Sequence, residues 1–284
     1  MRVRAFAKIN LSLRVLGVRA DGYHELRTIF QSIALHDTLT IGARRGPFRL
    51  TCSDPACPAD ETNLIWRAAA RMWTAAGRGG APRDVSIDLE KRIPMQAGLG
   101  GGSSDAAATL RALARRWRVG EAPVRAAARA LGADVPYFLE GGTVLGLERG
   151  DLLYPLFDPP AAWVVLVLPD FGVRTKDAFG WFDRFGVAAD PRVRRGADTQ
   201  VGPSINDLEA PVVARHPGIG RIISALHRQG ASQAAMSGSG SAVFGLFPLR
   251  RDADRAAKGL ASASRRTLVT KTLNRQNYQT LAAT

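Results

Sequence analysis

Residues that commonly hold metals or form disulfides are scarce in this sequence. Two of the 284 residues are cysteine, Cys52 and Cys57, and no histidine lies near them in the chain. Histidines are also few and lack the spacing of metal ligands, standing at positions 24, 36, 216 and 227. We therefore expect no zinc site. Two free thiols are typical of a protein that works in a reducing cytoplasm.

Long hydrophobic runs are missing as well. The longest, Ala161 to Leu168, is far too short to span a bilayer. Within Met1 to Lys8 a charged residue occurs again before any apolar stretch develops, so we expect no signal peptide. A hydrophobic content of 46% over 284 residues is typical of a globular chain and allows two domains of ordinary size.

Lysine is rare although the chain is strongly basic. The net charge is +14, but only five of the 39 basic residues are lysine, and the arginines are spread along the whole chain. A surface that binds nucleic acid usually gathers its basic residues on one face or along one helix. This composition therefore gives little support to an RNA-binding module, although an anionic small molecule would still be attracted by the positive charge.

The most informative stretch is a glycine-rich loop, Pro94 to Asp105, which reads Pro-Met-Gln-Ala-Gly-Leu-Gly-Gly-Gly-Ser-Ser-Asp. It follows a strand-like run, Val85 to Glu90, and leads into an alanine-rich helical stretch, Ala106 to Arg116. Glycine lets backbone amides approach an anion without a Cβ in the way. The N-terminus of a helix adds unpaired N–H donors and a positive dipole. The loop is therefore predicted to bind phosphate.

Two common phosphate-binding motifs do not fit this loop. A Walker loop ends in Gly-Lys-Ser/Thr, whereas Gly102 is followed directly by Ser103. A dinucleotide fingerprint needs glycine in place of Ser103 and an acidic residue that ends a second strand, but Glu121 lies between two helical stretches. A flexible linker is disfavoured because linkers seldom join a strand to an amphipathic helix so abruptly.

Several polar residues stand at well-defined places in predicted turns and strands. Lys8 and Asn10 share one face of a strand predicted over 3–16, and a tight turn at 21–22 precedes Tyr23 and His24. Asp134 stands between a glycine turn and a proline, which would hold its carboxylate in place. Each has an ordinary alternative: an exposed strand lysine, a rim aromatic beside a solvated histidine, and a carboxylate that caps a turn.

Hydrophobic periodicity predicts the rest of an α+β chain. Helices are expected at 63–73, 123–131, 175–182, 204–229 and 252–260. Strands are expected at 143–147, 161–168 and 267–272, with two short strands between 37 and 53, and residues 236–245 are expected to form a glycine turn that leads into an apolar strand. A change in composition at 153–160 predicts two domains, 1–155 and 156–284, the second with a split βαβ pattern. Residues 186–203 are expected to form a mobile surface insertion.

The order of these motifs resembles that of the GHMP kinases, over nearly the whole chain. The matching stretches are Ala7–Leu11, Arg19–His24, Pro94–Asp105, Gly132–Pro136, Asn206–Asp207 and Ser237–Gly240. The Ala-Asp-Gly-Tyr-His turn resembles the branch that acts on cytidine diphosphate methylerythritol. One departure is Leu147–Gly150, which replaces a more usual Gly-Ile-Gly-Glu.

The resemblance implies an ATP-dependent kinase with Mg²⁺ that phosphorylates the 2-hydroxyl of the methylerythritol unit, in the non-mevalonate route to isoprenoid precursors. A mevalonate- or homoserine-type kinase is the runner-up. The implied fold has an N-terminal domain like the second domain of a ribosomal small-subunit protein and a ferredoxin-like C-terminal domain. Binding to nucleic acid or membrane is not expected, and the protein would be a cytoplasmic monomer or weak homodimer.

The resemblance also implies roles for particular residues in a cleft between the domains. Lys8 and Asp134 would be catalytic. The expected ATP contacts are Asn63, Pro94, Gly98, Leu99, Gly100, Gly101, Gly102, Ser103 and Ser104. The expected contacts to the second substrate are Asn10, Tyr23, His24, Thr175 and Phe179. No residue is assigned to a metal.

Overall fold

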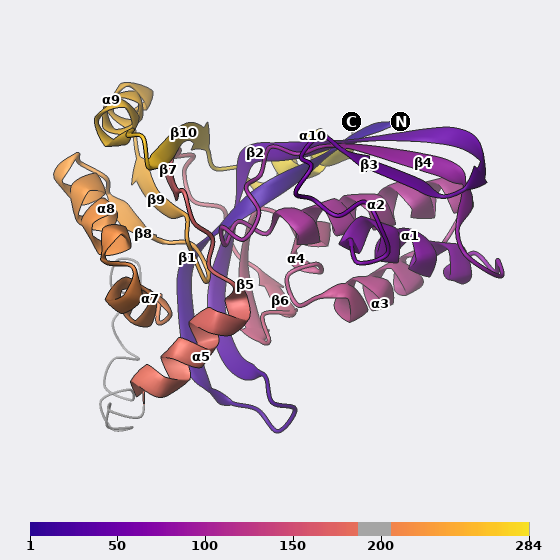
Figure 1. Ribbon diagram of the computed structural model, residues 1–284, viewed down its shortest axis with the longest axis horizontal. Helices are drawn as coiled ribbons and strands as arrows, with labels where there is room; N and C mark the ends of the chain where they lie inside the picture. The colour runs from indigo at the N-terminus through magenta and orange to yellow at the C-terminus, as the bar shows by residue number, and fades with distance from the viewer. Residues whose placement is uncertain (187–205, 284) are drawn as a thin grey trace.

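The computed structural model describes residues 1–186 and 206–283. The chain forms two sheets with helices packed on them, and the two parts lie side by side in Figure 1. The insertion predicted at 186–203 lies outside the described residues, except for Gly186 at the end of a helix. Among the described helices, none is both long and apolar enough to cross a membrane.

The first sheet has six strands in the order β3-β4-β2-β5-β6, with β1 paired to β2. Its strands are β1 (Arg2–Val18), β2 (His24–Pro47), β3 (Arg49–Cys52), β4 (Arg83–Glu90), β5 (Thr143–Glu148) and β6 (Leu152–Pro155). The prediction of two short strands after residue 37 was wrong in part, because β2 continues unbroken to Pro47 and only β3 is short. Strand β2 stays hydrogen-bonded over this length since β1 pairs with one edge while β5 and then β4 pair with the other.

Four helices cover one face of the first sheet (Figure 1). They are α1 (Leu64–Ala75), α2 (Gly101–Trp117), α3 (Glu121–Leu131) and α4 (Tyr137–Glu140). Helix α2 is central to this layer, and its Ala106, Ala107 and Leu110 are almost fully buried. It begins at Gly101, within the glycine-rich loop and five residues before the predicted start at Ala106.

The second sheet is antiparallel, in the order β10-β7-β9-β8. It contains β7 (Trp163–Pro169), β8 (Gln233–Met236), β9 (Val243–Phe247) and β10 (Arg265–Lys271), with helices α5 (Thr175–Gly186), α7 (Glu209–Arg215), α8 (Pro217–Arg228) and α9 (Arg250–Leu260). Strand β7 is buried on both faces. Val165 and Val167 pack toward the helices, while Val164 and Leu166 share a core with Ala7 of β1.

The last helix, α10 (Arg275–Ala283), was not predicted and returns to the first part of the molecule. Its Tyr278 packs against Phe6 of β1, and the two chain ends lie close together in Figure 1. The domain boundary predicted near residue 155 falls between β6 and β7. The boundary stays a prediction. Strand β1 belongs to the first predicted domain, yet its Leu13 and Val15 lie in the core of the second part.

Candidate active site

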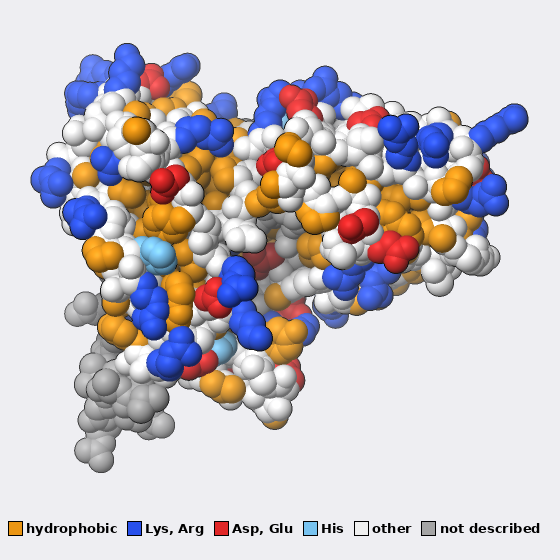
Figure 2. Space-filling model, viewed as in Figure 1, with side chains coloured by type: hydrophobic (Ala, Val, Ile, Leu, Met, Phe, Trp, Pro, Cys, Tyr) orange, Lys and Arg blue, Asp and Glu red, His pale blue; other side chains and the backbone are white. Residues whose placement is uncertain are grey.

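A cleft of about 990 Å³ lies between the two parts of the molecule. Figure 2 shows this face hollowed between them. Nearly all residues predicted for the site line the cleft: Lys8, Asn10, Tyr23, His24, Pro94, Gly98, Leu99, Gly100, Gly101, Gly102, Ser103, Asp134, Thr175 and Phe179. The tertiary fold thus brings together side chains that are separated by up to 171 positions (Lys8 to Phe179) in the sequence.

Two positions of the glycine-rich loop favour glycine both by backbone conformation and by lack of space. Gly98 and Gly100 have φ of 74° and 72°, in the left-handed region. A Cβ at Gly98 would collide with the carbonyl oxygen of Ser237, and one at Gly100 would come within 2.6 Å of the Phe138 ring. Ser237 also donates its hydroxyl to Gly98 O at 3.0 Å. The loop is therefore held by both parts of the molecule.

The N-terminal end of α2 is the anion-binding feature of the cleft. Gly100 caps the helix without any side-chain acceptor, and Gly101, Gly102 and Ser103 of the first turn line the cleft. The amides of a first helical turn have no partner inside the helix, and the dipole places partial positive charge there. A phosphate group can accept hydrogen bonds from this end.

Two residues predicted to contact ATP form hydrogen bonds to the backbone of the protein instead of lining the cleft. Ser104 is buried and donates its hydroxyl to Phe6 O at 2.7 Å. Asn63 caps α1, accepting from the amide of Ile65 at 2.8 Å and donating to Pro58 O at 2.6 Å. Among the residues described, neither lines the cleft, so their contact with ATP stays a prediction.

Lys8 and Asp134 form an ion pair inside the cleft. The distance between Lys8 Nζ and Asp134 Oδ2 is 3.6 Å, with the lysine side chain 4% exposed and the aspartate 36% exposed. Lys8 also donates to Asn10 Oδ1 at 2.6 Å. Burial lowers the pKa of Lys8, and the nearby Asp134 carboxylate opposes this effect only in part. An incoming anion would therefore stabilise the charged form of Lys8.

Local backbone features orient the side chains of Lys8 and Asp134. Lys8 and Asn10 lie between two irregularities in the pairing of β1 with β2, and such bulges turn side chains away from the regular pleat. Asp134 lies in a turn closed by the amide of Val135, which donates to Gly132 O at 3.1 Å. The following Pro136 begins the approach to α4. The carboxylate is therefore held on a short, constrained segment.

Aromatic side chains form a second region of the cleft. The rings of His24 and Phe179 are stacked with centroids 4.6 Å apart, and His24 Nε2 lies 2.7 Å from Asp183 Oδ1. Tyr23 is 56% exposed, and the guanidinium of Arg149 lies 5.1 Å from its ring centroid. Arg149 and Asp183 were not predicted. Arg149 belongs to the departure at 147–150, which was a signal that this loop needed attention.

A buried charge cluster lies beneath the glycine-rich loop. Lys91, another cleft residue that was not predicted, donates to Asp37 and, at 2.7 Å, to Asp105. Burial opposes the charge of Lys91, but the two carboxylates together raise its pKa. Burial raises the pKa of Asp105 to about 8 against the pull of Lys91, and Asp105 Oδ1 has no hydrogen-bond partner among the described residues. The rarity of lysine, with five in the whole chain, was the one sequence signal that could have pointed to Lys91.

We expect the raised pKa of Asp105 to make stability depend on pH. Because the folded chain holds this proton more tightly than the unfolded chain, its contribution is complete below the ordinary aspartate pKa of 3.8 and is lost as the pH rises toward about 8. Wild-type unfolding free energy should fall over this range by up to about 1.4 kcal/mol per pH unit from this group. Asp105→Asn, which resembles the protonated acid, should flatten the slope in urea titrations at pH 5–8.

The matched control is Asp88→Asn, the same change at an exposed position on β4. It should keep the wild-type slope. An Asp105→Asn slope equal to that of wild type would show that this carboxyl does not hold a proton in the folded protein near neutral pH.

Comparison with known proteins places the chain in a family. Residues 63–142 match the GHMP kinases N terminal domain, and residues 193–265 match the GHMP kinases C terminal domain. The 4-diphosphocytidyl-2-C-methyl-D-erythritol kinase of Moorella thermoacetica is 43% identical, over 95% of this chain and 98% of its own length. A crystal structure of 4-(cytidine 5'-diphospho)-2C-methyl-D-erythritol kinase superposes with a TM-score of 0.79 at 36% identity, covering 96% of this chain and 99% of the other.

A second kinase type shares the fold at a greater distance. The crystal structure of homoserine kinase from Cytophaga hutchinsonii has a TM-score of 0.67 at 19% identity, over 98% of this chain and 96% of its own. At that identity the likeness concerns the fold alone. The two-domain α+β fold and the kinase family predicted from the motifs are confirmed. The chain belongs to the GHMP kinase family, in its 4-diphosphocytidyl-2-C-methyl-D-erythritol kinase branch.

Proposed function

We propose that this protein transfers the γ-phosphoryl group of ATP to the 2-hydroxyl of 4-diphosphocytidyl-2-C-methyl-D-erythritol. The observation that carries the proposal is a single cleft that joins an uncapped helix N-terminus, the Lys8–Asp134 pair and an aromatic region. The names of the relatives at 43% and 36% identity support the choice of substrate.

The glycine-rich loop and Lys8 would act on the phosphates of ATP. Phosphoryl transfer depends mainly on in-line positioning and on neutralising charge at the transferring group. The amides of Gly101, Gly102 and Ser103 are fixed donors, and they lose little entropy when a phosphate binds. Lys8 would add a buried positive charge where burial strengthens its interaction with an anion.

Asp134 would orient the acceptor hydroxyl and accept its proton late in the transfer. A sugar hydroxyl is a very weak acid, so removing its proton before the P–O bond forms would be costly. The ammonium of Lys8, 3.6 Å away, would help to hold the carboxylate beside the acceptor. Asn10 would help through its hydrogen bond to Lys8, and its Nδ2 donates to Thr28 at 2.7 Å.

Mg²⁺ fits this site as a companion of ATP. Magnesium commonly keeps several waters and binds through phosphates and one or two protein oxygens. In the described residues no group of three histidine, cysteine or acidic side chains could hold a metal, but Ser103, which carries a hydroxyl, lines the cleft at the start of α2. This oxygen would hold the ion beside the phosphates, where it would neutralise their charge.

The aromatic region would bind the cytosine base. His24 and Phe179, stacked at 4.6 Å, leave no space for a base between their own rings, so the base would stack on Tyr23. His24 would read the base edge with one ring nitrogen while Asp183 holds the other. Thr175, at the start of α5, would contact the acceptor from the second part of the molecule.

The direct test is to incubate the pure protein with ATP, Mg²⁺ and 4-diphosphocytidyl-2-C-methylerythritol and to follow the reaction by phosphorus NMR. A new phosphomonoester signal on the methylerythritol 2-oxygen, together with ADP, is the expected result. Turnover of mevalonate or homoserine in place of this substrate would contradict the proposal.

An RNA-binding module is the alternative of a different class, and the surface does not favour it. Figure 2 shows lysine and arginine side chains spread over this face, with acidic side chains among them. Recognition of RNA would be expected to use basic and aromatic side chains gathered on one surface. The alternative also leaves the uncapped loop at α2 without a role.

We expect Tyr23→Ala to raise KM for the cytidine substrate by about ten- to a hundredfold, because stacking on an aromatic ring contributes about 1–3 kcal/mol per base. KM for ATP should change little. The measurement is KM for both substrates. Tyr154→Ala removes a similarly exposed tyrosine from β6, outside the cleft lining, and should keep both values. Weaker ATP binding with an unchanged cytidine KM would mean that the two nucleotide sites are reversed.

A further inference from the structure

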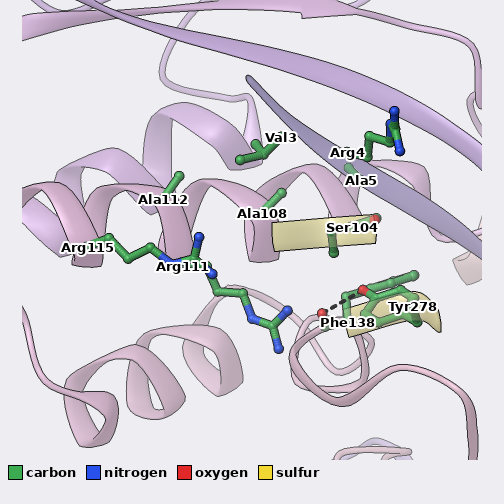
Figure 3. Close-up of a pocket in the computed structure, with 11 residues that line it drawn as sticks. Val3, Arg4, Ala5, Ser104, Ala108, Arg111, Ala112, Arg115, Phe138 and Tyr278 are labelled. Atoms are coloured by element: carbon green, nitrogen blue, oxygen red, sulfur yellow. Dashed lines mark hydrogen bonds between the residues drawn. The ribbon is translucent and has the colours of Figure 1, made fainter. Parts of the chain in front are cut away.

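The C-terminal helix α10 packs beneath the phosphate loop although it comes last in the sequence. Its Tyr278 is 3% exposed, with its ring centroid 5.6 Å from that of Phe6 on β1. Figure 3 shows Tyr278 next to Phe138, below the first turns of α2 where Ser104 lies. The helix thus contacts the element that follows Asp134.

Two glycines allow this close packing. Gly141, with φ of 71°, lies so near the Tyr278 ring that a Cβ there would collide with it. At Gly142 a Cβ would come within 2.8 Å of the backbone nitrogen of Arg275, at the start of α10. That nitrogen also donates to Asp158 at 2.8 Å. The seat of α10 is therefore closely shaped around the end of α4.

A hydrogen bond joins the two elements. The Tyr278 hydroxyl donates to the carbonyl oxygen of Phe138 at 2.7 Å, which is the dashed line in Figure 3. Burial raises the pKa of this hydroxyl, so it stays protonated and keeps its role as donor. Phe138 itself is 1% exposed. This contact holds the first turn of α4, four residues after Asp134.

Phe138 in turn supports the phosphate loop. Its ring fills the space beside Gly100, the residue that caps α2 in a left-handed conformation. Arg111 of α2 donates to Leu139 O, so α2 and α4 are also tied together further along. A displacement of Phe138 would remove the surface on which the turn at Gly100 lies.

We propose that Tyr278 is a positioning residue for the ATP phosphate loop, acting through Phe138 on Gly100. The inference rests on the proposed binding of ATP at this loop. Tyr278 does not line the cleft as the structure describes it, so it would act on ATP without touching it. Its hydroxyl would keep the loop amides in the geometry that phosphate needs, and the last helix would thereby become part of the nucleotide site.

The test is Tyr278→Phe, which removes the hydroxyl and keeps the ring. A buried hydrogen bond of this kind is worth a factor of about 3 to 10 in an equilibrium constant. KM for ATP should rise by that factor, and the Kd of a non-hydrolysable ATP analogue, measured by calorimetry without the acceptor, should rise with it. KM for the cytidine substrate should stay at the wild-type value.

The matched control is Trp73→Phe, which also removes one side-chain hydrogen bond to a backbone carbonyl, from Nε1 to Gly79 O at 2.9 Å. Trp73 packs against Trp117, at the opposite end of α2 from the loop. The Trp73→Phe variant should have a lower melting temperature than wild type and an unchanged KM for ATP. An unchanged ATP affinity in Tyr278→Phe, or an equal change in Trp73→Phe, would overturn the proposal and leave Tyr278 with a purely structural role.

A double-mutant cycle tests the route through Phe138. Phe138→Leu removes the ring beside Gly100 but keeps the backbone carbonyl that Tyr278 binds. If Tyr278 acts through this ring, the double variant should weaken ATP binding no more than Phe138→Leu alone. Additive effects would refute the route. If wild type fails to phosphorylate the cytidine substrate, the proposed function fails, while the calorimetric comparison with the ATP analogue still decides the role of Tyr278.

Discussion

Asp134→Asn should lower kcat by about 10²- to 10⁴-fold, the usual cost of removing a group that handles the proton in the transition state. The substitution keeps the shape of the side chain but removes its charge and most of its basicity. The variant would still present an oxygen to the acceptor, so the loss would measure proton acceptance and charge together. Steady-state kinetics at saturating substrates is the measurement.

The affinity for ATP should change little in this variant. The loop that would hold the phosphates is formed by Gly98 to Ser103, and its conformation depends on Ser237 and Phe138 and not on the Asp134 side chain. Asp254→Asn is a matched control, since Asp254 pairs with Arg250 on α9 and neither residue lines the cleft. It should keep kcat. A near-wild-type kcat in Asp134→Asn would show that Asp134 has no catalytic role and serves only as a carboxylate that caps its turn.

Lys8→Met should lose activity without losing stability. Lys8 is a buried cation of the cleft, and removing one preorganised donor from a developing charge typically costs about 10²- to 10³-fold in kcat. Methionine has a similar length and flexibility, so it should fill the same volume. Removing one partner of an ion pair is costly when the remaining charge is buried, but the Asp134 side chain is 36% exposed and can be hydrated in the variant.

The sign of the stability change follows from the lowered pKa of Lys8. The unfolded chain holds this proton more tightly than the folded chain, so the stability of wild type should rise with pH toward the ordinary lysine pKa of 10.5. Lys8→Met should remove this part of the slope and melt at the wild-type temperature or above it near neutral pH. Lys258→Met, at an exposed position on α9, should change neither property. A large drop in melting temperature would show that the charged lysine supports the fold.

The glycine-rich loop illustrates how much of the site could be predicted. Its glycines, the strand before it and the helix after it are neighbours in sequence, and a phosphate-binding turn is a local property of the backbone. Lys8, Tyr23, His24 and Asp134 were identified because each stands in a short motif of a known family. The family, the kinase activity and the two-domain α+β fold followed from the order of those motifs and were confirmed.

Lys91 and Arg149 were missed because their importance depends on partners far away in the chain. Lys91 is held by Asp37 and Asp105, at 54 and 14 positions from it, and no local pattern shows that these three charges are buried together. Arg149 is significant because its guanidinium lies over the ring of Tyr23, in the distant turn between β1 and β2. Pairings of this kind depend on which side chains the fold brings together.

The sequence by itself determined the elements whose causes are local: the strands, the phosphate loop and the family to which they belong. Strand alternation, helical periodicity and turn residues act over a few positions, so they can be read directly from the chain. Only the tertiary structure decided that β2 continues to Pro47, because its length depends on hydrogen bonds from three partner strands. It also decided that α10 lies beneath the loop, since two glycines at 141–142 leave space for a helix more than 130 positions later.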